Sequence, residues 1–279
     1  MQQAFELAID NGLTIRGNVH TQEEGTKPHP VLIFCHGFKG FKDWGSFPYA
    51  NEELSKQGIV SVRINFSRNG VGASLTDFDE LEKFAVNTYA REVLDLEVLL
   101  DALLSDQLPF SEQMDKENIY IVGHSKGGGD AILFGSASDK IKGIITWNGI
   151  ADVDLFDPKL RDEIANNGVG YIHNARTKQD MPIKQVVIDD VDQNEEKYNL
   201  IDKVSKLNKP LLIVQGEQDF ARLVKGAGRL HEAAPTSELH WISTGDHTWN
   251  AKHPFAGSTS ELEEAIRVTA DFVKKHTSA

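Results

Sequence analysis

The sequence predicts an α/β fold, in which a mostly parallel, twisted sheet of eight strands carries helices on both faces. Five short apolar runs without polar alternation are typical of strands buried on both faces of a parallel sheet. These runs are Val31–Cys35, Ile59–Phe66, Ile119–Val122, Ile144–Trp147 and Leu211–Val214. Between them lie helical patterns. The clearest is a stripe from Tyr89 to Leu103 with apolar residues at three- and four-residue steps. Alternating strands and helices favour a parallel α/β sheet.

The remaining three strands are expected at the two edges of this sheet. Apolar and polar residues alternate from Phe5 to Ile9 and from Leu13 to Val19. The intervening Asp10-Asn11-Gly12 is a strong turn signal, so these segments predict an N-terminal antiparallel hairpin. A polar, proline-containing linker follows over Gln22–Pro30. The weaker alternation of Leu239–Ile242 predicts an edge strand near the C-terminus.

The chain is predicted to close with an amphipathic helix. Leu262, Ala265, Ile266 and Phe272 recur at helical spacing, and Ser258 followed by Glu261 is interpreted as a capping box.

One segment interrupts this alternation of strands and helices. Between Gly149 and about Tyr198 no regular succession is evident, although Lys184–Ile188 is β-like. Because a structureless loop of this length is unusual, residues 150–198 are interpreted as a cap-like insertion. It is expected over the C-terminal edge of the sheet, within a single domain of residues 1–279.

Composition limits the classes of partner. The 279 residues are 40% hydrophobic and carry a formal net charge of −13, so nucleic acid and anionic membranes are not expected to bind. The single cysteine, Cys35, excludes an intrachain disulfide and is expected to be buried. No leader or membrane-spanning run is evident, which favours a cytoplasmic protein.

The motif Gly123-His124-Ser125-Lys126-Gly127 joins a predicted strand to a predicted helix. This context is typical of a nucleophile elbow, where a sharp turn exposes a serine hydroxyl and leaves no room for side chains on either side. The alternative is a glycine-rich turn with an incidental serine. A phosphate-binding loop is disfavoured, since the Walker spacing is absent. His124 is expected to pack, and the Lys126 side chain is interpreted as incidental.

A nucleophilic serine needs a base and an acid, which follow it in the order acid, then histidine. Asp219 lies just after the strand Leu211–Val214, and His247 lies in the loop after the last strand. Both therefore belong to the C-terminal edge of the sheet. For Asp219, capping of the next helix is the alternative role.

An oxyanion hole needs fixed N–H donors. Lys126 N–H, directly after the serine, and Phe38 N–H, in the turn after the strand Val31–Cys35, are the candidates. A plain glycine turn explains the Phe38 loop equally well, and His36 is expected to brace it. Six aromatic residues near strand ends either line an acyl pocket or pack the sheet edge: Phe38, Phe41, Trp44, Trp147, Phe220 and Trp249.

Together these motifs resemble those of the α/β-hydrolase superfamily, in particular bacterial serine esterases of the dienelactone-hydrolase-like and cinnamoyl/feruloyl-esterase-like groups. The resemblance is carried by Val31–Phe38, Asn65–Gly72, Gly123–Gly128, Asn174–Pro182, Gln215–Asp219 and Gly245–His247. Dienelactone hydrolases carry a cysteine nucleophile, and dehalogenases and epoxide hydrolases an aspartate. Ser125 therefore disfavours those chemistries.

The resulting hypothesis is a carboxylic-ester hydrolase acting on aryl or short-to-medium acyl esters, with Ser125, His247 and Asp219 as its triad. It requires neither a metal nor an organic cofactor, and the chain is expected to be a monomer or homodimer. Two alternatives remain open, namely a serine peptidase or amidase with the same triad and a non-catalytic ligand-binding homologue.

Overall fold

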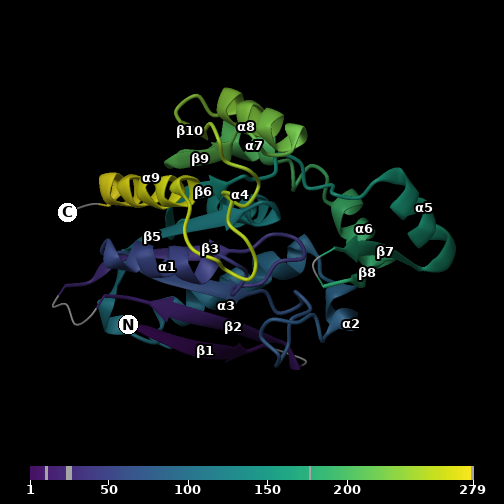
Figure 1. The fold of residues 1–279 in the computed structure, drawn as a ribbon, viewed down its shortest axis with the longest axis horizontal. Coiled ribbons are helices and arrows are strands. Elements are labelled where there is room, and N and C mark those ends of the chain that lie inside the picture. The colour runs from purple at the N-terminus through teal and green to yellow at the C-terminus, as the bar shows by residue number, and fades with distance from the viewer. Residues whose placement is uncertain (10–11, 23–26, 176, 278–279) are drawn as a thin grey trace.

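A central sheet of eight strands organises the chain in the computed structural model, which describes residues 1–9, 12–22, 27–175 and 177–277 (Figure 1). Its strands are β1 (Gln2–Ala8), β2 (Thr14–His20), β3 (His29–Cys35), β4 (Val60–Asn65), β5 (Met114–His124), β6 (Ile141–Trp147), β9 (Leu211–Gly216) and β10 (Glu238–Ile242). Their order is β1-β2-β4-β3-β5-β6-β9-β10. Strand β2 runs antiparallel to β1 and β4, and the other pairs are parallel. The predicted fold class is confirmed.

The N-terminal hairpin predicted from the alternation of apolar and polar residues is present as β1 and β2. Asp10 and Asn11 of its predicted turn lie outside the described residues, as do Arg176 and residues 23–26 of the predicted linker.

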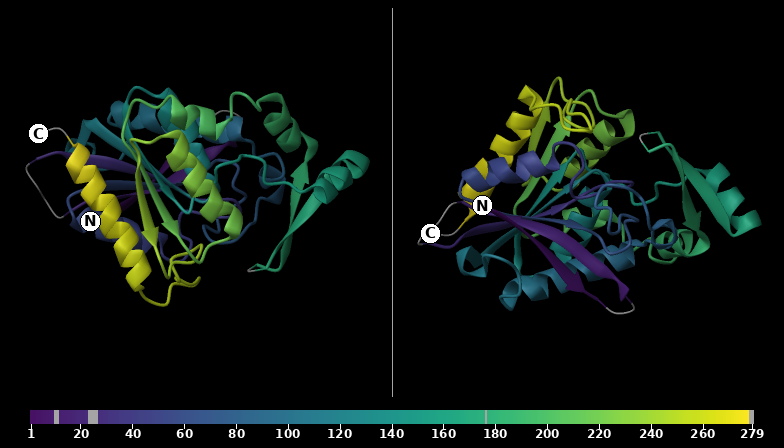
Figure 2. Two further views of the ribbon diagram at one scale, coloured as in Figure 1. Left: turned by 90° about the horizontal axis from the view of Figure 1, so that it is seen from above. Right: turned by 60° about the horizontal axis from the view of Figure 1, so that its bottom comes forward.

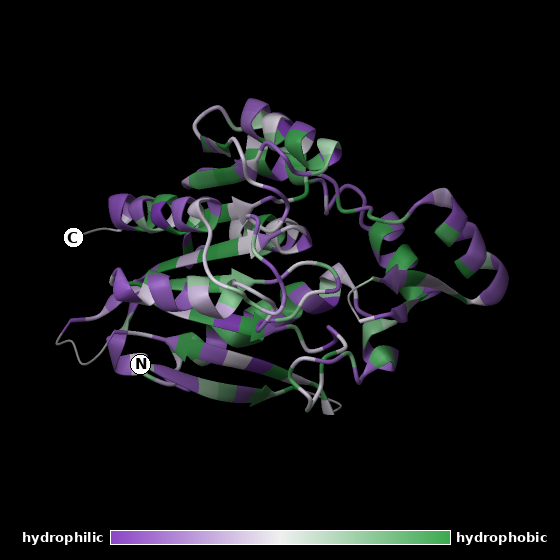
Figure 3. Cartoon of the chain, in the orientation of Figure 1, coloured by the Kyte–Doolittle hydropathy of each residue, from purple (hydrophilic) through white to green (hydrophobic). Residues whose placement is uncertain are grey.

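Burial explains why the central strands could be recognised from the sequence. Every residue of β4 and of β9 is buried, as are the five from Val31 to Cys35 in β3. A strand covered on both faces has no solvent side, so its sequence need not alternate. Strand β10 lies at the edge, and only Ile242 is buried there. Figure 3 shows the hydrophobic residues concentrated in the central strands, whereas the outer helices carry many hydrophilic ones.

The helices are α1 (Phe47–Lys56), α2 (Leu81–Phe84), α3 (Tyr89–Leu104), α4 (Lys126–Ala137), α5 (Pro158–Asn167), α6 (Gln185–Gln193), α7 (Leu200–Ser205), α8 (Ala221–Ala233) and α9 (Ser260–His276). Neighbouring residues of β6 show that they cover both faces (Figure 2). A Cβ on Gly128 of α4 would lie 3.4 Å from Thr146, whereas the Nε1 atom of Trp147 donates to Thr269 of α9. Within the described ranges, no helix has the length and apolar character that crossing a membrane requires.

The segment 150–198, here called the cap segment, contains α5, β7 (Val169–Asn174), β8 (Gln179–Lys184) and α6. Strands β7 and β8 form an antiparallel hairpin apart from the main sheet, and the whole unit lies at one end of the molecule (Figure 1). The expected β-stretch at 184–188 is wrong, because β8 ends at Lys184 and α6 begins at Gln185. Val187, Ile188 and Val191 are its buried residues, at steps of one and three that suit one face of a helix.

The start of α9 also differs from expectation. Its N-cap is Thr259, whose side chain accepts from the N–H of Leu262. The predicted capping box of Ser258 and Glu261 is therefore wrong by one residue. Both positions carry a hydroxyl that can cap a helix, so residue type alone did not distinguish them.

Candidate active site

Ser125 occupies a strained turn between β5 and α4. Its backbone has φ 57° and ψ −120°, in the region that residues other than glycine rarely adopt. A Cβ at Gly123 would lie 1.8 Å from the carbonyl oxygen of Gly127, and one at Gly127 would lie 2.5 Å from that of Cys35. Glycine is therefore required at both positions, and the turn directs the serine away from the strand that precedes it.

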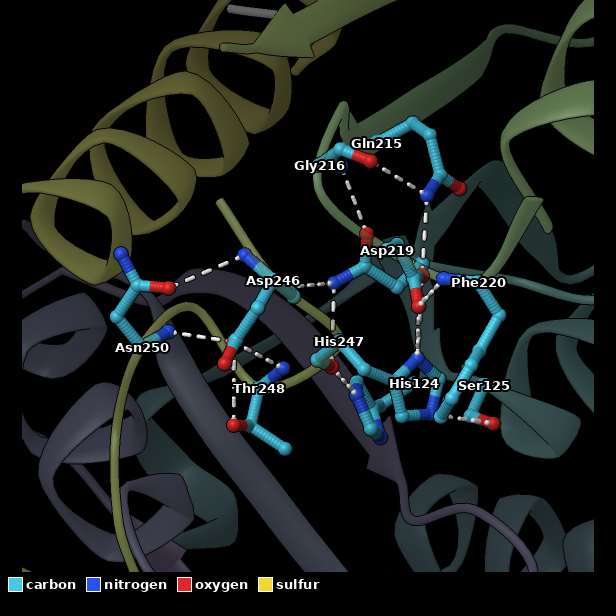
Figure 4. Close-up of polar contacts among 11 residues, drawn as sticks. His124, Ser125, Gln215, Gly216, Asp219, Phe220, Asp246, His247, Thr248 and Asn250 are labelled. Carbon is cyan, nitrogen blue, oxygen red and sulfur yellow. Dashed lines mark hydrogen bonds and ion pairs between the residues drawn. The ribbon is translucent and has the colours of Figure 1, made fainter. Parts of the chain in front are cut away.

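Three loops at the C-terminal edge of the sheet bring Ser125, His247 and Asp219 together (Figure 4). His247 Nε2 lies 3.1 Å from Ser125 Oγ. On the other side of the ring, Nδ1 lies 2.9 Å from Asp219 Oδ1 and 3.1 Å from Oδ2. Because a carboxylate only accepts, Nδ1 carries the proton, and Nε2 is the acceptor that faces the serine.

The carboxylate of Asp219 is fully shielded from solvent and held by further donors. Gln215 Nε2 donates to Oδ2 at 3.0 Å, and the N–H of Phe220 donates to Oδ1 at 2.6 Å. Helix α8 has Phe220 as its N-cap and no side-chain cap bond, so Asp219 does not cap this helix. The carboxylate faces the imidazole instead.

Two residues hold the histidine loop, a role that sequence reasoning missed. The carbonyl oxygen of His247 accepts from His124 Nε2 at 2.7 Å and from Asn148 Nδ2 at 3.2 Å. Asn148 Oδ1 also accepts from the N–H of Gly216 at 2.8 Å. This bond connects the end of β9, which precedes the Asp219 loop, to the residue that holds the histidine loop. Both residues stand at the carboxyl ends of their strands, β5 and β6, and that position was the available signal. His124 packs as expected, with its ring 4.8 Å from that of His247.

The predicted oxyanion donors lie beside the serine. A Cβ on Gly37 would lie 3.5 Å from Ser125 Oγ, so the turn carrying Phe38 passes close to the hydroxyl. Lys126 is the first residue of α4, where N–H groups have no partner within the helix. His36 Nδ1 lies 2.9 Å from the carbonyl oxygen of Gly37. Burial lowers the pKa of His36 to about 4, so a neutral imidazole donates there and braces the turn.

A small cavity of about 60 Å³ opens next to the serine, and its lining includes Phe38, Trp44, Phe47 and Thr248. A second, of about 20 Å³, lies between Phe38 and the cap segment, which contributes Leu155, Phe156, Ile183 and Val187.

Two of the six predicted pocket aromatics, Phe38 and Trp44, line the cavity beside the serine. The other four line neither cavity. Phe41, Trp147 and Trp249 are buried, and the two tryptophan rings pack edge to face at 6.1 Å. Phe220 is 62% exposed, with its ring 5.3 Å from that of His247. This placement favours packing at the sheet edge for the three buried rings.

The interpretation of the Lys126 side chain as incidental is wrong. The side chain is buried, and its Nζ contacts Glu92 and lies 3.0 Å from Asp130 Oδ2. It also stands 3.8 Å above the ring of Tyr89. Burial opposes the charge, but Asp130 and Glu92 raise the pKa of Lys126 above its usual value. Local sequence does not reveal this role, because Glu92 and Tyr89 come from another helix.

No protein-family model matches the chain. A 2,6-dihydropseudooxynicotine hydrolase of Paenarthrobacter nicotinovorans is 24% identical over 178 residues, which is 64% of this chain. The match spans 43% of that protein's own length.

Solved structures agree over nearly the whole chain. Ferulic acid-bound Est1E from Butyrivibrio proteoclasticus superposes with a TM-score of 0.73 at 21% identity, covering 98% of this chain and 99% of that one. The α/β hydrolase GrgF from Penicillium sp. sh18 gives 0.69 at 16%, with 99% of both chains covered. A dienelactone hydrolase from Anabaena variabilis gives 0.62 at 12%, covering 100% of this chain and 99% of that one. The chain therefore has the α/β-hydrolase fold.

Proposed function

We propose that the protein is a serine hydrolase that cleaves carboxylic esters through an acyl-enzyme. His247 Nε2 takes the proton of Ser125 as Oγ attacks the ester carbonyl carbon, and then returns it to the departing alcohol. Water, activated by the same nitrogen, cleaves the acyl-enzyme and releases the acid. Asp219 holds the imidazole in the required tautomer and stabilises its charged form.

One observation carries the proposal, namely the hydrogen-bonded chain from Ser125 through His247 to Asp219, built on a serine with positive φ. Strain of this kind persists only where surrounding structure maintains it, and it clusters at functional sites. The buried carboxylate adds to this support, because a shielded negative charge strongly favours the imidazolium that forms during attack.

Stabilisation of the developing oxyanion is assigned to two backbone donors, Phe38 N–H and Lys126 N–H. Support comes from the nearness of the Gly37 turn to Ser125 Oγ and from the helix start at Lys126, whose dipole favours negative charge. Because His36 is neutral and hydrogen-bonded to Gly37, this turn is fixed before substrate binds.

The proposed substrates are soluble esters with an aryl or short-to-medium acyl group. The cavity beside Ser125 is small and partly aromatic, which suits a compact acyl group. One structural neighbour, Est1E, was solved with ferulic acid, an aryl-propenoyl acid, and another is named a dienelactone hydrolase. These neighbours support a hydrolytic role on small molecules.

A panel of p-nitrophenyl esters from acetate to octanoate, with methyl ferulate added, tests the proposal. Wild-type protein should turn over at least one ester, and Ser125→Ala should lose nearly all of that turnover. Ser136→Ala, which removes a hydroxyl from the same helix α4, is the matched control and should keep it. Faster cleavage of peptide anilides would indicate an amidase instead. Failure of a fluorophosphonate to label Ser125 would indicate a protein that binds without catalysis.

A further inference from the structure

Lys126 combines a proposed backbone role at the active site with a buried, charged side chain. Its backbone N–H is an oxyanion donor in the proposed function, while its side chain is buried among charged groups of α3 and α4. A lysine is seldom buried unless it is paired, so a buried lysine directly after a candidate nucleophile requires an explanation.

Three groups hold the Lys126 ammonium. Glu92 of α3 contacts Nζ, Asp130 lies one helical turn along α4 with Oδ2 at 3.0 Å, and the Tyr89 ring lies 3.8 Å away. The side chains of Glu92 and Asp130 are almost completely buried. The ammonium therefore cannot be rehydrated in place, and any displacement of the first residue of α4 breaks several interactions together.

The two carboxyl groups of this cluster are shifted in opposite directions. Burial and the neighbouring Glu92 raise the pKa of Asp130 well above its usual value. Lys126 lowers the pKa of Glu92 against the effect of burial, which favours an ion pair between Glu92 and the ammonium. Asn87 Nδ2 donates to the second Glu92 oxygen at 2.6 Å and fixes its orientation.

The cluster also reaches the cap segment through Tyr89. The hydroxyl of Tyr89 donates to the carbonyl oxygen of Val153 at 3.0 Å, and its backbone N–H donates to Asp190 of α6 at 2.9 Å. The start of α3 is thus fixed to the cap segment on one side and to Lys126 on the other.

We propose that the Lys126 side chain is a positioning residue, which holds its own backbone N–H in the oxyanion hole through Glu92, Asp130 and Tyr89. The inference rests on the proposed function and deepens it. A donor shifted by about 1 Å loses much of its effect on the transition state. The side chain does not touch substrate, so its substitution affects the chemical step and leaves ground-state binding unchanged.

The test compares Lys126→Met with the double variant Glu92→Gln/Lys126→Met. The single variant leaves Glu92 without its cation, whereas the double variant removes the ammonium and the carboxylate of Glu92 together. Lys209→Met is the matched control, because that half-buried lysine donates to Gly135 and Ser138 at the other end of α4. For each protein we would measure the melting temperature, kcat and KM on the best ester of the panel. We would also measure inhibition by two compounds. One is an aryl boronic acid, whose serine adduct resembles the tetrahedral intermediate, and the other is the carboxylic acid product.

The expected result is a kcat about 10 to 100 times lower in both Lys126 variants, with KM within about twofold of wild type. Affinity for the boronic acid should fall in step with kcat, while affinity for the product stays unchanged. The double variant should recover the melting temperature of the wild type, whereas its kcat should stay low. Full kcat in either variant, or its return in the double variant, would overturn the inference. If the wild-type protein were inactive on every ester, the proposed function and this inference would fail together. If wild type is active and a Lys126 variant keeps full kcat, only this inference fails.

Discussion

His247 Nδ1 lies 2.9 Å from Oδ1 of Asp219, and the aspartate side chain that receives this contact has no exposure to solvent. In the proposed reaction, an ion pair formed there would be only weakly screened, because water does not reach the carboxylate. The contact also fixes which nitrogen of the ring faces Ser125.

Asp219→Asn should therefore lower kcat on an aryl ester by about 10³- to 10⁴-fold with little loss of folding stability. The amide would donate to Nδ1, so that the ring proton moves to Nε2 and the base is lost. Glu217→Gln, an exposed acid in the same loop, should leave kcat unchanged. Steady-state kinetics at pH 7 and thermal melting measure both effects. A kcat within tenfold of wild type would remove Asp219 from the proposed triad.

Gly127→Ala should destabilise the fold, because its Cβ would lie 2.5 Å from the carbonyl oxygen of Cys35 and 2.6 Å from that of His36. Backbone atoms cannot move aside cheaply, so we expect a loss of about 1 to 3 kcal/mol in the free energy of unfolding. Gly228→Ala in α8 is the control. Its Cβ would meet nothing within 4 Å, so it should gain about 0.5 to 1 kcal/mol. Urea titration measures both, and equal stabilities would contradict the packing argument.

Acid should weaken the fold partly through His36. Its pKa is about 4 in the folded protein against 6.5 for an ordinary histidine, so between these values the unfolded chain binds more protons. Stability is therefore present above pH 6.5 and falls as the pH drops toward 4, by about 3 kcal/mol for this group. His36→Asn keeps a donor for Gly37 without titrating. Unfolding free energies at pH 7 and pH 4.5 should differ less in this variant, and an identical pH dependence would reject the assignment.

Thr259→Ala should cost about 1 kcal/mol, because it removes the N-cap bond to the Leu262 N–H. The Thr259 hydroxyl also donates to the carbonyl oxygen of Trp249 at 2.6 Å, which adds to the expected loss. Ser258→Ala, one residue earlier, removes only an exposed contact with Glu263 and should change stability by less than about 0.5 kcal/mol. Chemical denaturation compares the two, and a larger loss from Ser258→Ala would restore the capping box expected from the sequence.

The sequence predicts the sheet well, for a physical reason. Strand β9 and the Val31–Cys35 part of β3 are buried on both faces, and the apolar runs that result are hard to mistake. The candidate triad could be predicted equally well from the sequence, because in this fold each member follows a strand in a fixed order.

The same reasoning fails where partners are distant in sequence. The 184–188 stretch contains apolar residues that suit a strand or one face of a helix, and only packing decides between them. The burial of Lys126 depends on Glu92, 34 positions earlier in the chain. The hydrogen bonds from Asn148 to the histidine loop likewise arise only when β6 and that loop meet.

The cap segment leaves and rejoins the main fold at one place. A Cβ on Gly129 would lie 2.8 Å from Ile150 Cδ1 and 3.5 Å from Leu200 Cδ1, so the two flanks of the segment meet over a single glycine of α4. An excursion with adjacent ends can be lengthened, shortened or exchanged without shifting any strand. The cap segment can in this sense vary independently of the sheet, and a graft between these two residues would exchange it while leaving the strands and the candidate triad in place.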